Sequence, residues 1–94
     1  MESLYPEIER LIAENSLEEA LRQIAVARTG ADSVRIAELS FLRGKIYFRL
    51  GRRAAAISAY SEAAAAQPGD NRYATALAML RRIEDFFNPD LLNP

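Results

Sequence analysis

An internal repeat constrains this chain more than any other feature. A shift of 36 residues places small side chains on small ones and large side chains on large ones. The superposed pairs are Asn15 with Gly51, Ala20 with Ala56, Leu21 with Ile57, Ile24 with Tyr60, and Ala27 with Ala63. Small residues at Ala20 and Ala56 let two helices approach closely, and the larger residues beside them fill the remaining space. The period is typical of stacked helical repeats.

Apolar residues recur at spacings of three and four, which predicts helices and no strand. Breaks in this pattern divide the chain into five expected helices, at about residues 5–14, 17–28, 33–50, 53–66 and 72–87. Ser16 followed by Glu19 is the pattern of a capping box at the start of the second helix. Asp32 or Ser33 is placed to cap the third helix, and Asp70 to cap the fifth.

Two glycines in the middle of the chain need a structural reason. Gly44 lies inside the periodic part of the third helix, where glycine costs about 1 kcal/mol relative to alanine. We therefore expect Gly44 to mark a place where the helix backbone presses against a neighbour. Gly51 follows the last periodic residue, and we expect it to adopt the left-handed conformation that ends a helix.

Composition narrows the chemistry available to the chain. Its 94 residues are 50% apolar and 27% charged, the balance of one small soluble domain. The absence of cysteine and histidine excludes thiolate and imidazole catalysis and every metal site built on those ligands. No glycine-rich phosphate loop is present. We expect no catalytic residue, no metal and no cofactor, and the lack of a secretion or membrane-spanning pattern predicts a cytoplasmic protein.

Seven residues share their spacing with a known family: Gly44, Tyr47, Gly51, Ala56, Tyr60, Ala63 and Pro68. In this respect the chain resembles the tetratricopeptide repeat family. Two residues depart from the family pattern, Arg43 in place of leucine and Ser40 in place of an aromatic residue, and we expect both to weaken the core slightly.

The resemblance implies an all-α fold, in which antiparallel helical hairpins stack as a short right-handed solenoid. Its parts would be about two repeats and a C-terminal capping helix. Residues 1–36 would form a divergent repeat, 37–70 the repeat that matches best, 71–87 the capping helix and 88–94 a tail.

The family's role is protein–protein interaction, so the resemblance implies a protein or peptide partner in a concave groove. The implied partner-binding positions are Tyr5, Glu9, Glu38, Phe41, Leu42, Lys45, Arg49, Arg72, Met79 and Arg82. Phe41, Leu42 and Met79 could equally fill a narrow core, and the sequence leaves that choice open.

Two other functions stay open beside peptide binding. The domain could be a self-assembling homodimer, and the apolar tail within DFFNPDLLNP could fold back on the last helix or dock on another copy. A less favoured alternative is RNA binding through a basic stripe, which comprises Arg43, Lys45, Arg49, Arg52 and Arg53. The formal net charge of −1 disfavours nucleic acid as a partner.

Overall fold

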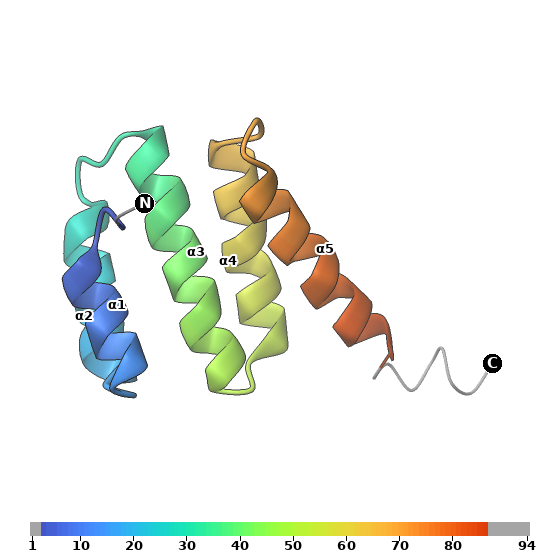
Figure 1. Ribbon diagram of the computed structural model, residues 1–94, viewed down its shortest axis with the longest axis horizontal. Helices are drawn as coiled ribbons and strands as arrows, with labels where there is room; N and C mark the ends of the chain where they lie inside the picture. The colour runs from blue at the N-terminus through green and yellow to red at the C-terminus, as the bar shows by residue number, and fades with distance from the viewer. Residues whose placement is uncertain (1–2, 87–94) are drawn as a thin grey trace.

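The computed structural model describes residues 3–86, which fold into five α-helices with no strand among them (Figure 1). The helices are α1 (Pro6–Ala13), α2 (Leu17–Arg28), α3 (Ser33–Arg49), α4 (Arg53–Ala66) and α5 (Asn71–Phe86). The expectation of an all-α chain is therefore confirmed for the described residues, and the five helices lie where the periodicity placed them. Residues 87–94, which contain the apolar tail, lie outside the described residues.

The helix starts show which capping predictions hold. Asp32 accepts a hydrogen bond from the backbone N–H of Arg35 at 2.9 Å, and the Asp70 carboxylate accepts one from the backbone N–H of Arg72 at 3.0 Å. The prediction of a capping box is wrong, because the Ser16 side chain makes no capping hydrogen bond. The Glu19 carboxylate instead accepts hydrogen bonds on the helix surface from Nη2 of Arg22, at 2.5 Å, and from the amide of Gln23. The charged Arg22 competes with the backbone N–H groups for this carboxylate.

The turns after α1 and α3 have the same backbone geometry. Asn15 and Gly51 both have positive φ, 62° and 75°. The backbone N–H of the residue after Asn15 donates to the Leu11 carbonyl at 2.8 Å, and that of the residue after Gly51 donates to the Tyr47 carbonyl at 2.9 Å. This bond and a left-handed residue together close a helix end. The 36-residue offset thus relates the two turns in conformation as well as in sequence.

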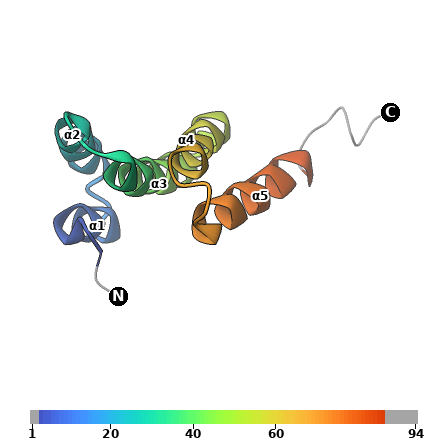
Figure 2. The same ribbon diagram turned by 90° about the horizontal axis from the view of Figure 1, so that it is seen from above.

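α3 is the central helix of the molecule. Seen from above, α2 and α4 lie on one side of it, and α1 and α5 lie toward the other (Figure 2). Ala20 and Ala56 are fully buried, as their match in the repeat predicts. A Cβ on Gly44 would lie 2.2 Å from Cε1 of Tyr60, so the close approach expected at this glycine is confirmed. α3 and α4 could not pack this tightly with a larger residue at Gly44.

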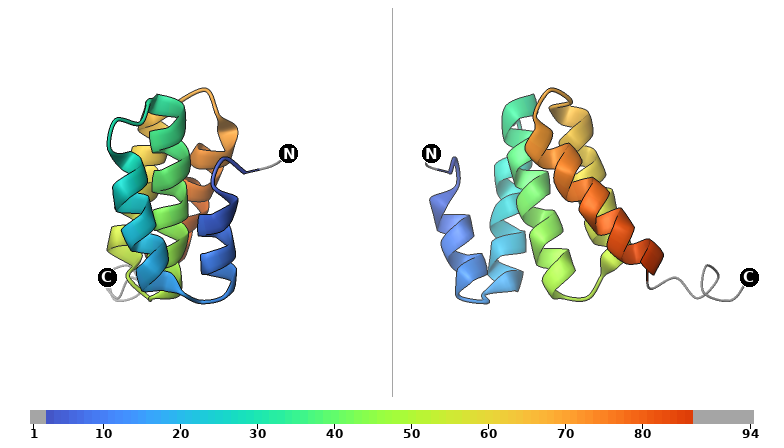
Figure 3. Two further views of the ribbon diagram at one scale, coloured as in Figure 1. Left: turned by 90° about the vertical axis from the view of Figure 1, so that its left-hand side faces the viewer. Right: turned by 45° about the vertical axis from the view of Figure 1, so that its right-hand side comes forward.

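The core has one part on each side of the central helix. The first joins α1, α2 and α3 around Ile8, Ile24 and Leu42. The second joins α3, α4 and α5 and consists of two neighbouring clusters, one around Tyr73 and one around Tyr60, with Phe41 packed against both. α5 leans away from α3 toward its C-terminal end (Figures 1 and 3). Within residues 3–86, none of the helices has the length and apolar content needed to cross a bilayer.

Candidate partner-binding groove

Figure 2 shows that one face of α3 lies between α1 and α5. Side chains from these three helices line a groove on that face. Its volume is about 350 Å³, at the lower end of the range of about 300–1,000 Å³ typical of ligand pockets. We call it the α1–α5 groove and define it by its lining residues: Ser3, Leu4, Glu9, Val34, Glu38, Phe41, Lys45, Arg72 and Tyr73. The groove therefore combines residues from three helices and from the segment before α1.

Five of the ten positions implied by the resemblance come together in this groove, namely Glu9, Glu38, Phe41, Lys45 and Arg72. Each of the three helices that line the groove contributes at least one of them. Phe41 belongs to both the groove and the core, because its partly buried ring lines the groove and also packs against the second part of the core.

The other five positions lie elsewhere. Leu42 is fully buried, so it belongs to the core, and Tyr5 packs partly buried against the same cluster. Met79 is 57% exposed on a different surface. Arg49 lies near the groove and donates a hydrogen bond to the carbonyl of Ile12. Arg82, the fifth position, is exposed on α5 and does not line the groove.

Four residues of the groove were missed by sequence reasoning: Ser3, Leu4, Val34 and Tyr73. Tyr73 directly follows Arg72 in the first turn of α5, and its aromatic side chain was a signal that could have been followed. The other three residues lie at or before the start of a helix, where periodicity says little about which way a side chain faces.

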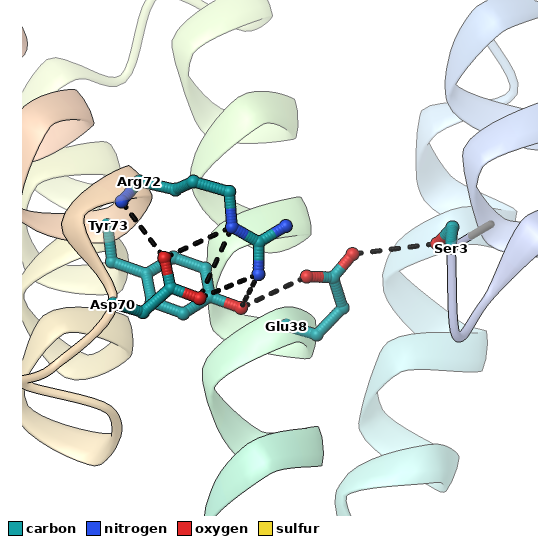
Figure 4. Close-up of polar contacts among 5 residues, drawn as sticks. All are labelled: Ser3, Glu38, Asp70, Arg72 and Tyr73. Carbon is teal, nitrogen blue, oxygen red and sulfur yellow. Dashed lines mark hydrogen bonds and ion pairs between the residues drawn. The ribbon is translucent and has the colours of Figure 1, made fainter. Parts of the chain in front are cut away.

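Glu38 lies at the centre of a short hydrogen-bonded chain (Figure 4). The residue is 9% exposed. Its Oε2 accepts a hydrogen bond from the Tyr73 hydroxyl at 3.1 Å, and its Oε1 accepts one from the Ser3 hydroxyl at 3.5 Å. Nη2 of Arg72 in turn donates to the Tyr73 oxygen at 3.2 Å. Glu38 thereby links α3 to the start of α5 and to the segment before α1.

Two further groups hold this chain in place. The Arg72 guanidinium pairs with Asp70 at 2.8 Å, and this hydrogen bond is the main reason why the pKa of Arg72 is raised. Burial raises the pKa of Tyr73 to about 12, and the nearby charge of Glu38 adds to that effect. The Tyr73 phenol is protonated at neutral pH and donates its hydrogen bond to Glu38.

Aromatic rings pack together beneath the groove, and Phe41 lines it. The Phe41 ring lies 5.4 Å from the Tyr73 ring in an edge-on arrangement and 5.3 Å from the Tyr60 ring. Nζ of Lys45 lies 4.7 Å from the centre of the Phe41 ring, and the Arg72 guanidinium lies 5.1 Å from the centre of the Tyr73 ring. Ring pairs and cation–ring contacts of this kind fix the orientation of the side chains that take part.

A second polar cluster lies between α2, α3 and α4, and it contains Ser40 and Arg43, the two residues that differ from the pattern of the family that the chain resembles. Glu62 accepts hydrogen bonds from Ser40 and Arg43, the two departing residues, and from Arg28. The nitrogen–oxygen distances are 2.6 Å for Arg28 and 3.0 Å for Arg43. The hydrogen bond from Arg28, with help from Ser40, lowers the pKa of Glu62 to about 2. Ser40 and Arg43 therefore join three helices through one carboxylate.

Several side chains of the basic stripe are bound to partners within the chain. Arg43 pairs with Glu62, Arg49 donates to a backbone carbonyl, and Arg53 pairs with Glu84 at 3.2 Å. Cations held by internal partners are less able to contact phosphates.

An apolar hollow of about 180 Å³, lined by residues of α3, α4 and α5, is distinct from the α1–α5 groove. Its lining residues are Phe48, Tyr60, Ala76, Met79, Leu80 and Ile83. Phe48 is 45% exposed, and Met79 is more exposed still. Exposed apolar side chains that line a hollow are typical of interaction surfaces.

The α1–α5 groove offers hydrogen-bonding groups, charges of both signs and ring surfaces. Among residues 3–86, no three acidic side chains come together in a way that could hold a metal ion.

Comparisons of the chain with protein-family models, with curated proteins and with solved structures find no match. The chemistry of the groove itself is therefore what points to a function.

Proposed function

We propose that this chain is a protein-interaction module that binds a peptide or a partner helix in the α1–α5 groove and catalyses no reaction. In this proposal the helices form a short right-handed solenoid of the tetratricopeptide type, with α5 as the capping helix. The groove would then be its concave, ligand-binding face.

One observation carries the proposal: the groove combines apolar surface with charges of both signs. Leu4, Val34 and the partly buried Phe41 contribute apolar surface, while Glu9, Lys45 and Arg72 contribute charges. Apolar surface beside charged groups is the usual anatomy of a protein-recognition surface.

The repeat architecture is supported by features that recur after 36 residues. Asn15 and Gly51 take the same left-handed conformation in equivalent turns. Ala20 and Ala56 are both fully buried. Recurrence at these positions is what stacked helical hairpins require, because each hairpin must bury one face against the next.

Selection from a random peptide library tests the proposal. Peptides displayed on phage would be selected on the immobilised protein, and the enriched peptides titrated into ¹⁵N-labelled protein. We expect the largest amide shifts in the groove, at Glu38, Phe41 and Tyr73, and loss of binding in the double variant Phe41→Ala/Lys45→Glu. Enriched peptides that shift only amides outside the groove would contradict the proposal.

Self-association is a second candidate function, and the apolar hollow favours it. A second copy that covered Phe48 and Met79 would remove exposed apolar surface from water. Light scattering over a range of concentrations would detect the dimer. If it forms through the hollow, Met79→Glu should restore the mass of one chain, and an unchanged dimer in that variant would exclude this surface.

A further inference from the structure

Glu38 is a nearly buried charge for which the described residues supply no ion-pair partner. Its hydrogen-bond donors are two neutral hydroxyls, those of Tyr73 and Ser3. No ion pair within residues 3–86 includes Glu38 or its groove neighbour Glu9. A carboxylate withdrawn from water is costly unless a positive charge accompanies it. Glu38 is therefore suited to a cation brought by a ligand.

The nearest cation on α5 does not fill this role. The Arg72 guanidinium is bound to Asp70 through several hydrogen bonds and reaches Glu38 only through the Tyr73 hydroxyl. Arg72 therefore orients Tyr73 toward Glu38 and does not itself pair with the carboxylate.

The surroundings of Glu38 suit a long basic side chain better than a small cation. Leu4 and Val34 line the same groove, and each is 52% exposed. Their apolar surface can cover the methylene stem of arginine or lysine while the charged end reaches the carboxylate. Each oxygen of Glu38 accepts one hydrogen bond, and a carboxylate has about four acceptor sites in total. The remaining sites allow the two parallel hydrogen bonds that a guanidinium makes.

Lys45 limits how much positive charge the ligand can carry. It lines the same groove seven residues beyond Glu38 on α3, about 10 Å along the helix. At this end Lys45 and the carboxylate of Glu9 line the groove together, so a second cation of the ligand would gain little net attraction. The groove thus favours one basic side chain, the one that reaches Glu38.

We propose that the ligand of the α1–α5 groove is a peptide segment that presents a single arginine, with its guanidinium on Glu38 and its stem between Leu4 and Val34. This assignment rests on the proposed function and specifies the chemistry of the partner.

A matched pair of peptides tests the proposal. The first is a blocked heptapeptide of leucine and alanine with one central arginine, and the second carries citrulline, which is neutral and of the same shape. Each is titrated into the ¹⁵N-labelled full chain, and affinity is read from the amides of Glu38, Phe41 and Tyr73. We expect the arginine peptide to bind at least tenfold more tightly than the citrulline peptide.

Two variants assign that preference to one carboxylate. Glu38→Gln keeps the acceptor for Tyr73 and should reduce the arginine preference to less than threefold. Glu62→Gln removes the carboxylate of the other cluster, which is not part of the groove, and should preserve the tenfold preference. Circular dichroism melts of both variants verify that they are folded before the comparison is made.

Several results would overturn the arginine assignment. They are equal binding of the two peptides to the wild-type chain, an unchanged preference in Glu38→Gln, shifts confined to amides outside the groove, and no shift with either peptide. A dimer that dissociates on Glu38→Gln would overturn it as well, because the carboxylate would then serve a second copy. If library peptides without arginine bind in the groove, this inference fails and the proposed function stands. If no library peptide binds there, the proposed function itself fails.

Discussion

The two faces of α3 each carry a glutamate cluster, and the two clusters differ in how they balance charge. Glu62 reaches α3 from α4 and is met by Arg28 and Arg43, although its side chain is 37% exposed. Glu38, on the groove face, is more buried, and among residues 3–86 its hydrogen-bond donors are hydroxyl groups. A charge that is paired within the chain stabilises the fold, whereas a charge left without a counterion remains available to a ligand.

The difference also separates structural residues from candidate binding residues on a single helix. Gly44, Ser40 and Arg43 are occupied by contacts with α4. Glu38 and Lys45 face the open groove. Four substitutions test this division of α3, and we describe them from the largest expected effect on stability to the smallest.

Gly44→Ala should have the largest effect. Alanine would normally favour a helix by about 1 kcal/mol over glycine. Here the added Cβ would lie 2.2 Å from the Tyr60 ring, so the ring and α4 must move. We expect the free energy of unfolding to fall by about 1–3 kcal/mol, measured by urea denaturation. Gly69→Ala is the matched control because no atom lies within 4 Å of its Cβ position, and it should unfold like the wild-type chain.

Glu62→Gln should have a smaller effect, which depends on pH. The pKa of Glu62 is about 2 in the folded chain, below its ordinary value of 4.5. The charged pair therefore contributes stability above about pH 4.5, and this contribution is lost as the pH falls toward 2. Since the carboxylate is partly exposed, we expect a loss of about 1 kcal/mol at neutral pH.

The control for Glu62→Gln is the same stability measurement repeated at lower pH. Urea denaturation at pH 6, 4 and 3 should show the stability curves of the wild type and the variant converging as the pH falls. Parallel curves over this range would mean that the arginines do not stabilise the ionised form of Glu62.

Tyr73→Phe should cost about 0.5–1.5 kcal/mol, the usual range for one hydrogen bond. The ring and its edge contact with Phe41 are kept, so the loss reports the hydroxyl between Arg72 and Glu38. Thermal unfolding at pH 7 measures it, and the alkaline titration followed at 295 nm should lose the phenol whose pKa is about 12. If the variant and the wild type gave the same titration curve at high pH, the buried position of Tyr73 would be contradicted.

Glu38→Gln should change stability least, by no more than about 0.5 kcal/mol in either direction. Glutamine still accepts a hydrogen bond from Tyr73, and the substitution removes a nearly buried charge for which the described part of the chain supplies no ion-pair partner. Urea denaturation beside Glu62→Gln gives the comparison directly. A loss larger than that of Glu62→Gln would show that the Glu38 charge is structural and would remove the contrast between the two faces.

Sequence reasoning found the helices and the close packing of α3 on α4 because these follow from local rules. Helical periodicity involves residues three and four apart, and a glycine inside a helix has few explanations other than close approach. Gly44 and Gly51 were therefore interpreted correctly before any contact was known. The capping box at Ser16 shows the limit of such rules, since an arginine one turn further along took the Glu19 carboxylate.

The candidate site was harder to predict than the helices. The sequence resemblance placed Glu38 and Arg72 on one face, but Tyr73, which joins them, was missed. Leu42, next to Phe41 in the chain, proved to be core because a helix turns by about 100° per residue and carries neighbours to different faces. Which of two adjacent apolar residues is buried depends on how neighbouring helices pack around them.

By itself, the sequence determined where each helix begins and ends, which turns need a left-handed residue, and where two helices meet through small side chains. Only the tertiary structure decided which charges find partners. Tyr73 and Glu38 are 35 residues apart, and Ser40 and Glu62 are 22 residues apart. Hydrogen bonds act over about 3 Å, so contacts at these separations exist only once the helices have packed.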